Sequence, residues 1–239
     1  AKGHSASYAV ESYQSLYLKC YFPLEFMTAV LNNGGGFYSA EHYFHEARQQ
    51  GATICLPCIN KSDHPNRLIG TSIYLGFGYL KNLEAYTIKR VLTERQLHGH
   101  FKSLDDFIDR VLISIEQLTI FIRIDAFRFT NKPKVELLWE AIFKLNAKGK
   151  ETIQSKLFKT EHKQFTLPKL DNNWIENAYD EMELLGFPLC NYFDLVNQPM
   201  EDGYLASQMN QFIGKNMLIY GNLVTTRYNK TSQGKLMRL

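Results

Sequence analysis

The fold is decided by residues 68–95, which read LIGTSIYLGFGYLKNLEAYTIKRVLTER. Residues 68–78 are rich in Ile, Tyr and Phe with glycines between them, a composition that predicts two short strands. Residues 79–95 are interpreted as a helix, a turn and a second helix, with the turn at Lys81-Asn82-Leu83-Glu84. Two strands followed by a helical hairpin are therefore expected at this point of the chain.

Upstream of this stretch the pattern is helical. Apolar and aromatic residues recur at helical spacing over 5–20, and Pro23 suits the first turn of a second helix. A third helix is predicted over 39–50, and a short strand over 52–56. Near residue 68 the character of the sequence changes from this helical pattern to the glycine-punctuated stretch described above.

Downstream, Ser103 is expected to cap a helix whose first turn holds Asp105 and Asp106. The two acids have the look of a metal pair, but the dipole at a helix start explains them more simply. The elements expected after them are a second hairpin unit over 113–127, helices over 135–145 and 173–185, and strands over 217–225 and 235–237.

Composition limits the class of protein. At 239 residues the chain exceeds one average domain, so two or three units are expected. The balance of 27 basic against 24 acidic residues gives a net charge of +3, so any contact with DNA must be a local patch or must depend on parts of the protein outside this chain. No apolar run approaches the ~20 residues that cross a bilayer, and no secretory leader opens the chain, so a cytoplasmic protein is expected.

The opening residues 1–8 combine a cation, an imidazole and hydroxyls at the start of a helix. Free N–H groups and the positive end of the helix dipole favour an anion such as phosphate there, with Lys2 adding charge and His4 a donor. The simpler alternative is that Gly3 and Ser5 cap the helix while Lys2 and His4 are solvated.

Cys55-Leu-Pro-Cys58 has the spacing of half a zinc site, with histidines nearby in sequence. A closed structural site needs four ligands, and no second pair completes it. Leu56-Pro57 suits a buried extended segment, so structural packing is preferred to a metal site.

Several of these motifs together resemble the bacterial DNA polymerase III alpha subunit, the replicative family C polymerase. Lys2-x-His4-x-x-x-Tyr8 and the following Tyr-Phe-Pro-Leu-Glu-Phe-Met turn are similar to its fingers domain. The resemblance implies that Lys2, His4 and Tyr8 contact the triphosphate of the incoming nucleotide.

The same family carries a helix-hairpin-helix where this chain has residues 79–95. Its hairpin reads Lys-Gly-Val-Gly, and the glycines let backbone N–H groups approach a DNA phosphate. Asn82 and Glu84 replace those two glycines here, and Asp125 replaces the glycine of the second hairpin. Phosphate binding by the first hairpin backbone is thereby in doubt, and Lys81, Lys89 and Arg90 remain as candidate DNA contacts, against the alternative of a solvated helix face.

Gln154-Ser-Lys-Leu157-Phe158 resembles the pentapeptide that binds the bacterial sliding clamp. Such a peptide places two apolar side chains in a groove while the glutamine bonds at the rim. Gln154, Leu157 and Phe158 are the implied clamp contacts.

The resemblance implies a mainly α, multidomain fragment. Its expected parts are the end of the fingers (1–67), a tandem helix-hairpin-helix domain (68–147), a link with the clamp peptide (148–172), a connector (173–210) and the truncated first hairpin of an OB-fold barrel (211–239). The catalytic carboxylates of the family, which hold two Mg²⁺ ions, lie in the palm upstream. This fragment is therefore expected to have no catalytic residue, metal or cofactor of its own and to be inactive alone.

Three interpretations remain open. The first is a polymerase fragment whose partners are primed DNA, the incoming nucleotide and the sliding clamp. The second is a noncatalytic adaptor for DNA and the clamp, from a degenerate paralogue, which the lost glycines motivate. The third is an unrelated helical protein with a zinc clip at Cys55 and Cys58.

Overall fold

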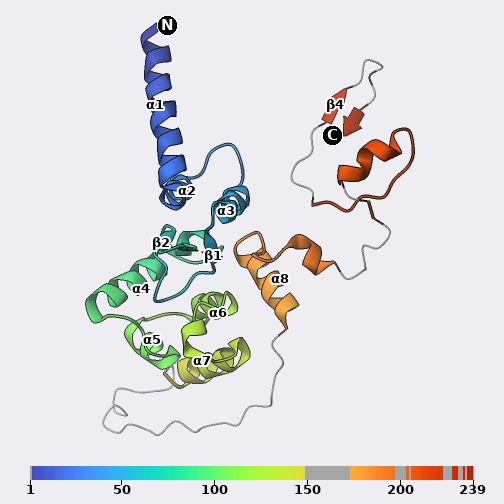
Figure 1. Ribbon diagram of the computed structural model, residues 1–239. Helices are drawn as coiled ribbons and strands as arrows, with labels where there is room; N and C mark the ends of the chain where they lie inside the picture. The colour runs from blue at the N-terminus through green and yellow to red at the C-terminus, as the bar shows by residue number, and fades with distance from the viewer. Residues whose placement is uncertain are drawn as a thin grey trace. The chain divides into compact units, whose positions relative to one another are not determined.

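The computed structural model describes residues 2–148, 173–196, 203–204, 206–222, 228–230, 234 and 236–238. The chain divides into two compact units, Ala1–Leu189 and Cys190–Leu239. The first unit is mainly helical, as the sequence predicts, with one small sheet (Figure 1). The predicted clamp peptide, residues 154–158, lies outside the described residues.

The described elements of the first unit follow one another with short connections between most of them. In chain order they are α1 (Lys2–Tyr21), α2 (Pro23–Asn32), α3 (Ala40–Gln49), β1 (Thr53–Cys55), β2 (Arg67–Ile69), β3 (Ser72–Tyr74), the 3-10 turn η1 (Phe77–Tyr79), α4 (Ala85–His98), α5 (Leu104–Arg110), α6 (Ile115–Arg123), the 3-10 turn η2 (Arg128–Thr130), α7 (Lys134–Lys148) and α8 (Trp174–Leu184).

The sheet has the strand order β1-β3-β2. β2 and β3 form the antiparallel hairpin that the sequence predicts, with Leu68 opposite Ile73. β1 joins β3 in parallel, with Ile54 beside Ile73. The expected boundary between residues 67 and 68 therefore falls inside one sheet, and the finer division into five parts stays a prediction.

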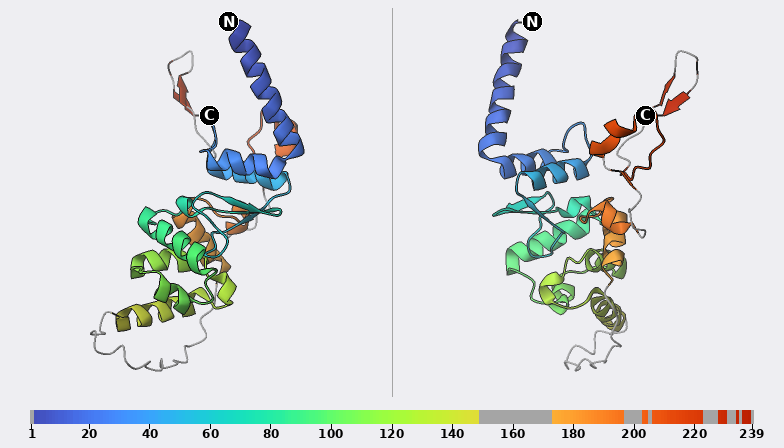
Figure 2. Two further views of the ribbon diagram at one scale, coloured as in Figure 1. Left: turned by 90° about the vertical axis from the view of Figure 1, so that its left-hand side faces the viewer. Right: turned by 45° about the vertical axis from the view of Figure 1, so that its right-hand side comes forward.

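In both figures the sheet lies between the helices α2 and α3 and the helix α4 (Figures 1 and 2). Its inward side chains, Ile54 and Ile73, belong to the same buried cluster as Met27 and Phe44 of the two preceding helices. Burial of such side chains contributes about 1.5–3 kcal/mol each. The sheet therefore couples the N-terminal helices to the hairpins that follow.

A network of hydrogen bonds fixes the chain before β2 and after β3. The Asn32 amide oxygen accepts hydrogen bonds from the backbone N–H and the side chain of Asn66, at 2.8 and 2.9 Å. The Asn66 amide oxygen in turn accepts from the Gly76 N–H at 3.0 Å. Because Asn66 is buried, these bonds satisfy groups that water does not reach.

Two helix boundaries differ from the prediction. The first helix already includes Lys2, so Lys2 and His4 lie within α1 and not in a turn before it. The predicted helix at the start of 79–95 is a single 3-10 turn, because the glycine-rich chain before it stays extended up to Gly76 and α4 begins only at Ala85. The turn and the second helix are confirmed.

In the second unit the described elements are the 3-10 turns η4 (Tyr192–Leu195) and η5 (Ala206–Phe212) and the antiparallel strands β4 (Tyr228–Lys230) and β5 (Leu236–Arg238). The returning strand falls where it is expected. The alternating residues 217–222 are not a strand, so the prediction of a strand from 217 is wrong there. The OB-fold barrel stays a prediction.

None of the described helices is both long enough and apolar enough to span a lipid bilayer.

The crowding around Gly76 predicts a large effect of adding one methyl group. A Cβ at Gly76 would lie 2.3 Å from the His64 carbonyl oxygen and 2.5 Å from the Pro65 carbonyl carbon, and backbone cannot move aside as a side chain can. Gly76→Ala should lower the free energy of unfolding by about 3 kcal/mol, measured by urea denaturation.

Gly70→Ala is the matched control. Gly70 has a left-handed φ of 61° but no neighbour within 4 Å of its Cβ position, so only backbone strain is added. That strain costs about 1 kcal/mol. Equal losses in the two variants would contradict the close approach at Gly76.

Candidate nucleic-acid interface

The first hairpin, residues 81–84, keeps its turn although its glycines are replaced. Asn82 has a φ of 62°, in the left-handed region that glycine adopts most readily. Asn is one of the few other residues that adopts this conformation routinely, because its short polar side chain can bond locally. The replacement of the first glycine therefore preserves the path of the backbone into α4.

The backbone N–H groups of the first hairpin are engaged within the protein. The Glu84 N–H donates to the Gln117 side-chain oxygen at 2.8 Å, and the Gln117 amide nitrogen donates to the Asn82 carbonyl at 2.9 Å. The Lys81 N–H donates to the Leu184 carbonyl, near the end of α8, at 2.8 Å. The Leu83 N–H also donates, to the Leu80 carbonyl at 3.4 Å. Three N–H groups of this hairpin therefore already have acceptors, which a phosphate would have to displace.

The second hairpin, residues 124–127, ends α6 in a Schellman motif. The Ala126 N–H donates to the Phe121 carbonyl and the Asp125 N–H to the Ile122 carbonyl, both at 2.9 Å. Asp125 has a φ of 59°, at the position that usually requires glycine. Its carboxyl group is half-buried, and this desolvation raises its pKa, with Lys134 and Arg128 opposing the shift.

Four buried phenylalanines join the hairpins through their ring edges. Phe107 of α5 lies 5.0 Å from Phe127 and 6.1 Å from Phe121, and Phe121 lies 5.4 Å from Phe77, all in edge-to-face geometry. Each such pair adds about 0.5–1.5 kcal/mol beyond its buried area. The two hairpins thus share one aromatic core.

The segment with the two cysteines is structural packing. The Arg128 guanidinium donates to the carbonyls of Leu56 and Pro57, each at 2.8 Å, and the Ile59 N–H donates to the Ala126 carbonyl at 3.1 Å. Among the described residues, no group of three or more His, Cys, Asp or Glu side chains is placed to hold a metal ion.

The predicted DNA contacts lie on or beside α4. Lys81 and Lys89 are exposed, whereas Arg90 is half-buried. Arg90 donates to the Leu112 carbonyl at 2.6 Å, and its guanidinium carbon lies 5.6 Å from the centre of the Tyr86 ring. Lys81 and Lys89 are therefore the freer cations, while Arg90 also holds the chain after α5.

The predicted nucleotide contacts are exposed on α1. His4 and Tyr8, one turn apart, bring their ring centres to 4.4 Å. Lys2 is two residues from His4 and six from Tyr8, so it points away from that pair on a helix. The structure thus brings two of the three side chains together.

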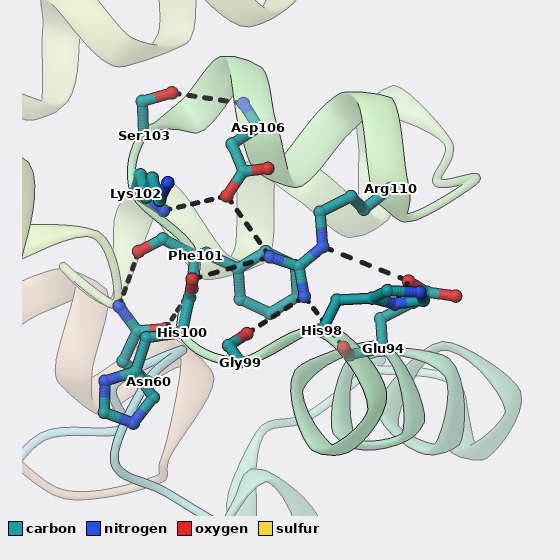
Figure 3. Close-up of polar contacts among 10 residues, drawn as sticks. All are labelled: Asn60, Glu94, His98, Gly99, His100, Phe101, Lys102, Ser103, Asp106 and Arg110. Atoms are coloured by element: carbon teal, nitrogen blue, oxygen red, sulfur yellow. Dashed lines mark hydrogen bonds and ion pairs between the residues drawn. The ribbon is translucent and has the colours of Figure 1, made fainter.

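Asp105 and Asp106 are ion-paired residues at a helix start, as the sequence predicts. The Ser103 hydroxyl accepts a hydrogen bond from the Asp106 N–H (Figure 3). The Asp105 carboxylate lies 2.6 Å from the Lys144 ammonium. The Asp106 carboxylate lies 3.2 Å from Arg110.

Arg110 holds the link between α4 and α5. Its guanidinium donates to the carbonyls of Glu94 and Gly99, at 2.7 and 2.9 Å, and stacks 4.1 Å from the centre of the Phe101 ring (Figure 3). Glu94, His98, His100, Lys102, Asp106 and Arg110 line a shallow depression there.

Comparison with known proteins identifies a helix-hairpin-helix domain in this chain. The family described as "Helix-hairpin-helix motif" matches residues 51–137, a range that includes the sheet and both hairpins. The chain thus contains a helix-hairpin-helix domain, in agreement with the turns at Asn82 and Asp125.

The particular relatives are DNA polymerases. The chain is 30% identical over 213 residues to the DNA polymerase III subunit alpha of Aquifex aeolicus, which covers 84% of this chain and 18% of that protein. It is 29% identical over 196 residues to the same subunit of Borreliella burgdorferi, covering 78% and 17%. It is 27% identical over 223 residues to the error-prone DNA polymerase of Vibrio vulnificus, covering 91% and 20%. The predicted resemblance is confirmed, and the chain spans about a fifth or less of these relatives.

Sequence reasoning missed Gln117. It is the one polar residue among the buried residues of α6, and it lies four residues before Phe121 and therefore on the same helix face. A glutamine on a buried face is a signal for a specific hydrogen-bonding partner.

The burial of Asp125 predicts a dependence of stability on pH. The pKa of Asp125 is raised in the folded state, so the folded protein binds the proton more tightly than the unfolded chain does. The stability that comes from this proton is therefore lost as the pH rises through the raised pKa. Asp125→Asn should therefore gain stability over wild type at pH 7, and the gain should shrink towards pH 4, as measured by urea denaturation.

Asp125→Ala separates charge from backbone conformation. This variant lacks the same carboxylate, but alanine adopts the left-handed conformation less readily than asparagine. Asp125→Ala should therefore be less stable than Asp125→Asn by about 1 kcal/mol at every pH. Parallel pH profiles for wild type and Asp125→Asn would contradict the buried-carboxylate account.

Proposed function

We propose that this chain is the part of a bacterial DNA-directed DNA polymerase that holds primed DNA beside the active site during replication. The observation that carries the proposal is the helix-hairpin-helix domain, with its left-handed turn positions occupied by Asn82 and Asp125, within a chain similar to alpha subunits over most of its length. Hairpins of this kind position a protein on the phosphate backbone and read no sequence.

Within this proposal the DNA contacts are side chains. Because the N–H groups of Lys81 and Glu84 have internal acceptors, the duplex is held by the exposed ammonium groups of Lys81 and Lys89, with Arg90 beside them. Lys2, His4 and Tyr8 contribute contacts to the triphosphate of the incoming nucleotide. Mg²⁺ and its carboxylates belong to the palm of the longer protein, and the fragment alone does not incorporate nucleotides.

The alternative is a noncatalytic adaptor that binds DNA and the clamp. The engagement of the hairpin N–H groups by Gln117 and Leu184 favours it, because a protein that no longer grips DNA for synthesis can use these groups for packing. If the gene sequence upstream of residue 1 encodes the catalytic carboxylates of the palm, the polymerase is favoured over the adaptor.

DNA binding is tested by removing the exposed ammonium groups of Lys81 and Lys89. Lys81→Gln with Lys89→Gln should weaken binding to a primed duplex similarly for all sequences. It should also lower the slope of log affinity against log salt by about 2, since each phosphate contact contributes about 0.9. Fluorescence anisotropy from 50 to 300 mM salt measures both.

The control is a double variant that also loses two positive charges, but at lysines that are already paired with carboxylates. Lys19 lies 2.5 Å from Glu46, and Lys132 pairs with Glu140, so Lys19→Gln with Lys132→Gln should leave the slope unchanged. A wild-type slope in the Lys81/Lys89 variant would remove these residues from the interface.

The proposed clamp contact has its own test. Leu157→Ala with Phe158→Ala should weaken binding to a bacterial sliding clamp by roughly 100-fold or more, because two apolar anchors of about 2 kcal/mol each are lost. Ser155→Ala with Lys156→Ala, at the two variable positions of the motif, should bind as wild type. Surface plasmon resonance measures the affinity for the clamp. If the affinity is unchanged in the Leu157/Phe158 variant, the proposed clamp contact is wrong.

A further inference from the structure

The small sheet has one buried and one open face. Strand register places Arg67 opposite Tyr74 and Cys55 beside Tyr74, so these three side chains share a face. Ile54 and Ile73 point the other way and are buried. The side chains of the open face are exposed or half-buried, including Thr53 and Arg67 at its edges.

Cations surround Tyr74 on that face. The Lys61 ammonium donates to the Tyr74 hydroxyl at 3.0 Å and lies 5.1 Å from the ring centre. The Arg128 guanidinium carbon lies 6.0 Å from the same ring centre. Arg67 stands directly across from Tyr74 on β2. Charged side chains from a loop (Lys61), from β2 (Arg67) and from η2 (Arg128) therefore lie around one aromatic ring.

The carboxylates nearby do not neutralise this charge. Asp63 is shared, with Arg95 bonded to one oxygen and the Arg67 Nε 3.7 Å from the other. Arg128 also faces the half-buried Asp125, whose pKa is raised by desolvation. In the part of the chain that the structure describes, the exposed Lys61 forms no ion pair with a carboxylate, and the Tyr74 hydroxyl raises its pKa. With Arg95 beside Asp63 and Lys134 beside Asp125 included, five cations therefore lie around two acids.

We propose that Lys61, Arg67 and Arg128, arranged around Tyr74, form a second DNA-backbone contact, separate from Lys81 and Lys89. The proposal rests on the proposed DNA-binding function and adds a surface to it. Tyr74 positions Lys61 by accepting its hydrogen bond. Its ring is already flanked by two cations, which favours phosphate over a stacked base as the ligand.

The three cations can bind the phosphate backbone of a DNA strand, because one is held in place and two can move. Arg128 is fixed by its bonds to the carbonyls of Leu56 and Pro57, so it supplies charge without moving. Lys61 and Arg67 are exposed and free to contact phosphate oxygens. An exposed ion pair such as that of Arg67 with Asp63 contributes little stability, so a phosphate can displace the carboxylate.

The test uses the 239-residue chain and a fluorescent primed duplex. Lys61→Gln with Arg67→Gln should lower the salt slope of binding by about 2, while the control Lys19→Gln with Lys132→Gln keeps it. Tyr74→Phe should lower it by less than 1, since the charges stay but Lys61 loses its fixed position. Thermal denaturation of each variant checks that the fold is retained.

The outcomes separate this inference from the proposed function. A wild-type slope for the Lys61/Arg67 variant, with a reduced slope for the Lys81/Lys89 variant, overturns the sheet-face contact and leaves the proposed function in place. An equal loss in the ion-paired control overturns it as well, since net charge alone would then explain the effect. Absence of DNA binding by the wild-type chain contradicts the proposed function itself.

Discussion

The arrangement of the two hairpins depends on one buried side chain, that of Gln117. It is 7% exposed and makes two hydrogen bonds to the first hairpin, one as donor to Asn82 and one as acceptor from Glu84. Leaving either backbone group unsatisfied in the interior would cost about 1–3 kcal/mol. Because α4 begins directly after Glu84, the direction of this helix, and with it the position of Lys89 and Arg90, follows from a residue on α6.

The same contact explains how the hairpins tolerate the loss of glycine. Left-handed backbone is needed at positions 82 and 125, and Asn and Asp are the side chains that adopt it with the least strain. The second glycine position, Glu84, has a φ of −72°, which any residue adopts, so glycine is not needed there for conformation. What glycine would allow at that position is close approach of a phosphate. Here Gln117 occupies the N–H group in its place.

Local chemistry made much of this fold predictable, and distant partners limited the rest. Ser103 caps α5, Pro23 opens α2 and Gly186 follows α8, because each depends on residues within one turn of itself. The parallel pairing of β1 with β3 was not predicted, since nothing within either strand specifies a partner 19 residues away in register. The same holds for the site, where the partners of Gln117 lie 33 and 35 residues away.

α8 is joined to both hairpins by ion pairs and a backbone hydrogen bond. Arg123 of α6 lies 2.7 Å from Asp180 of α8, and Lys134 of α7 lies 3.4 Å from the other oxygen of that carboxylate. The helices before and after residues 149–173 are thus fixed to the same core. The Lys81 N–H also donates to the Leu184 carbonyl at 2.8 Å, so the end of α8 is bonded to the first hairpin. Because Asp180 pairs with α6 and α7 while Leu184 binds the first hairpin, α8 helps to hold the two hairpins in one arrangement.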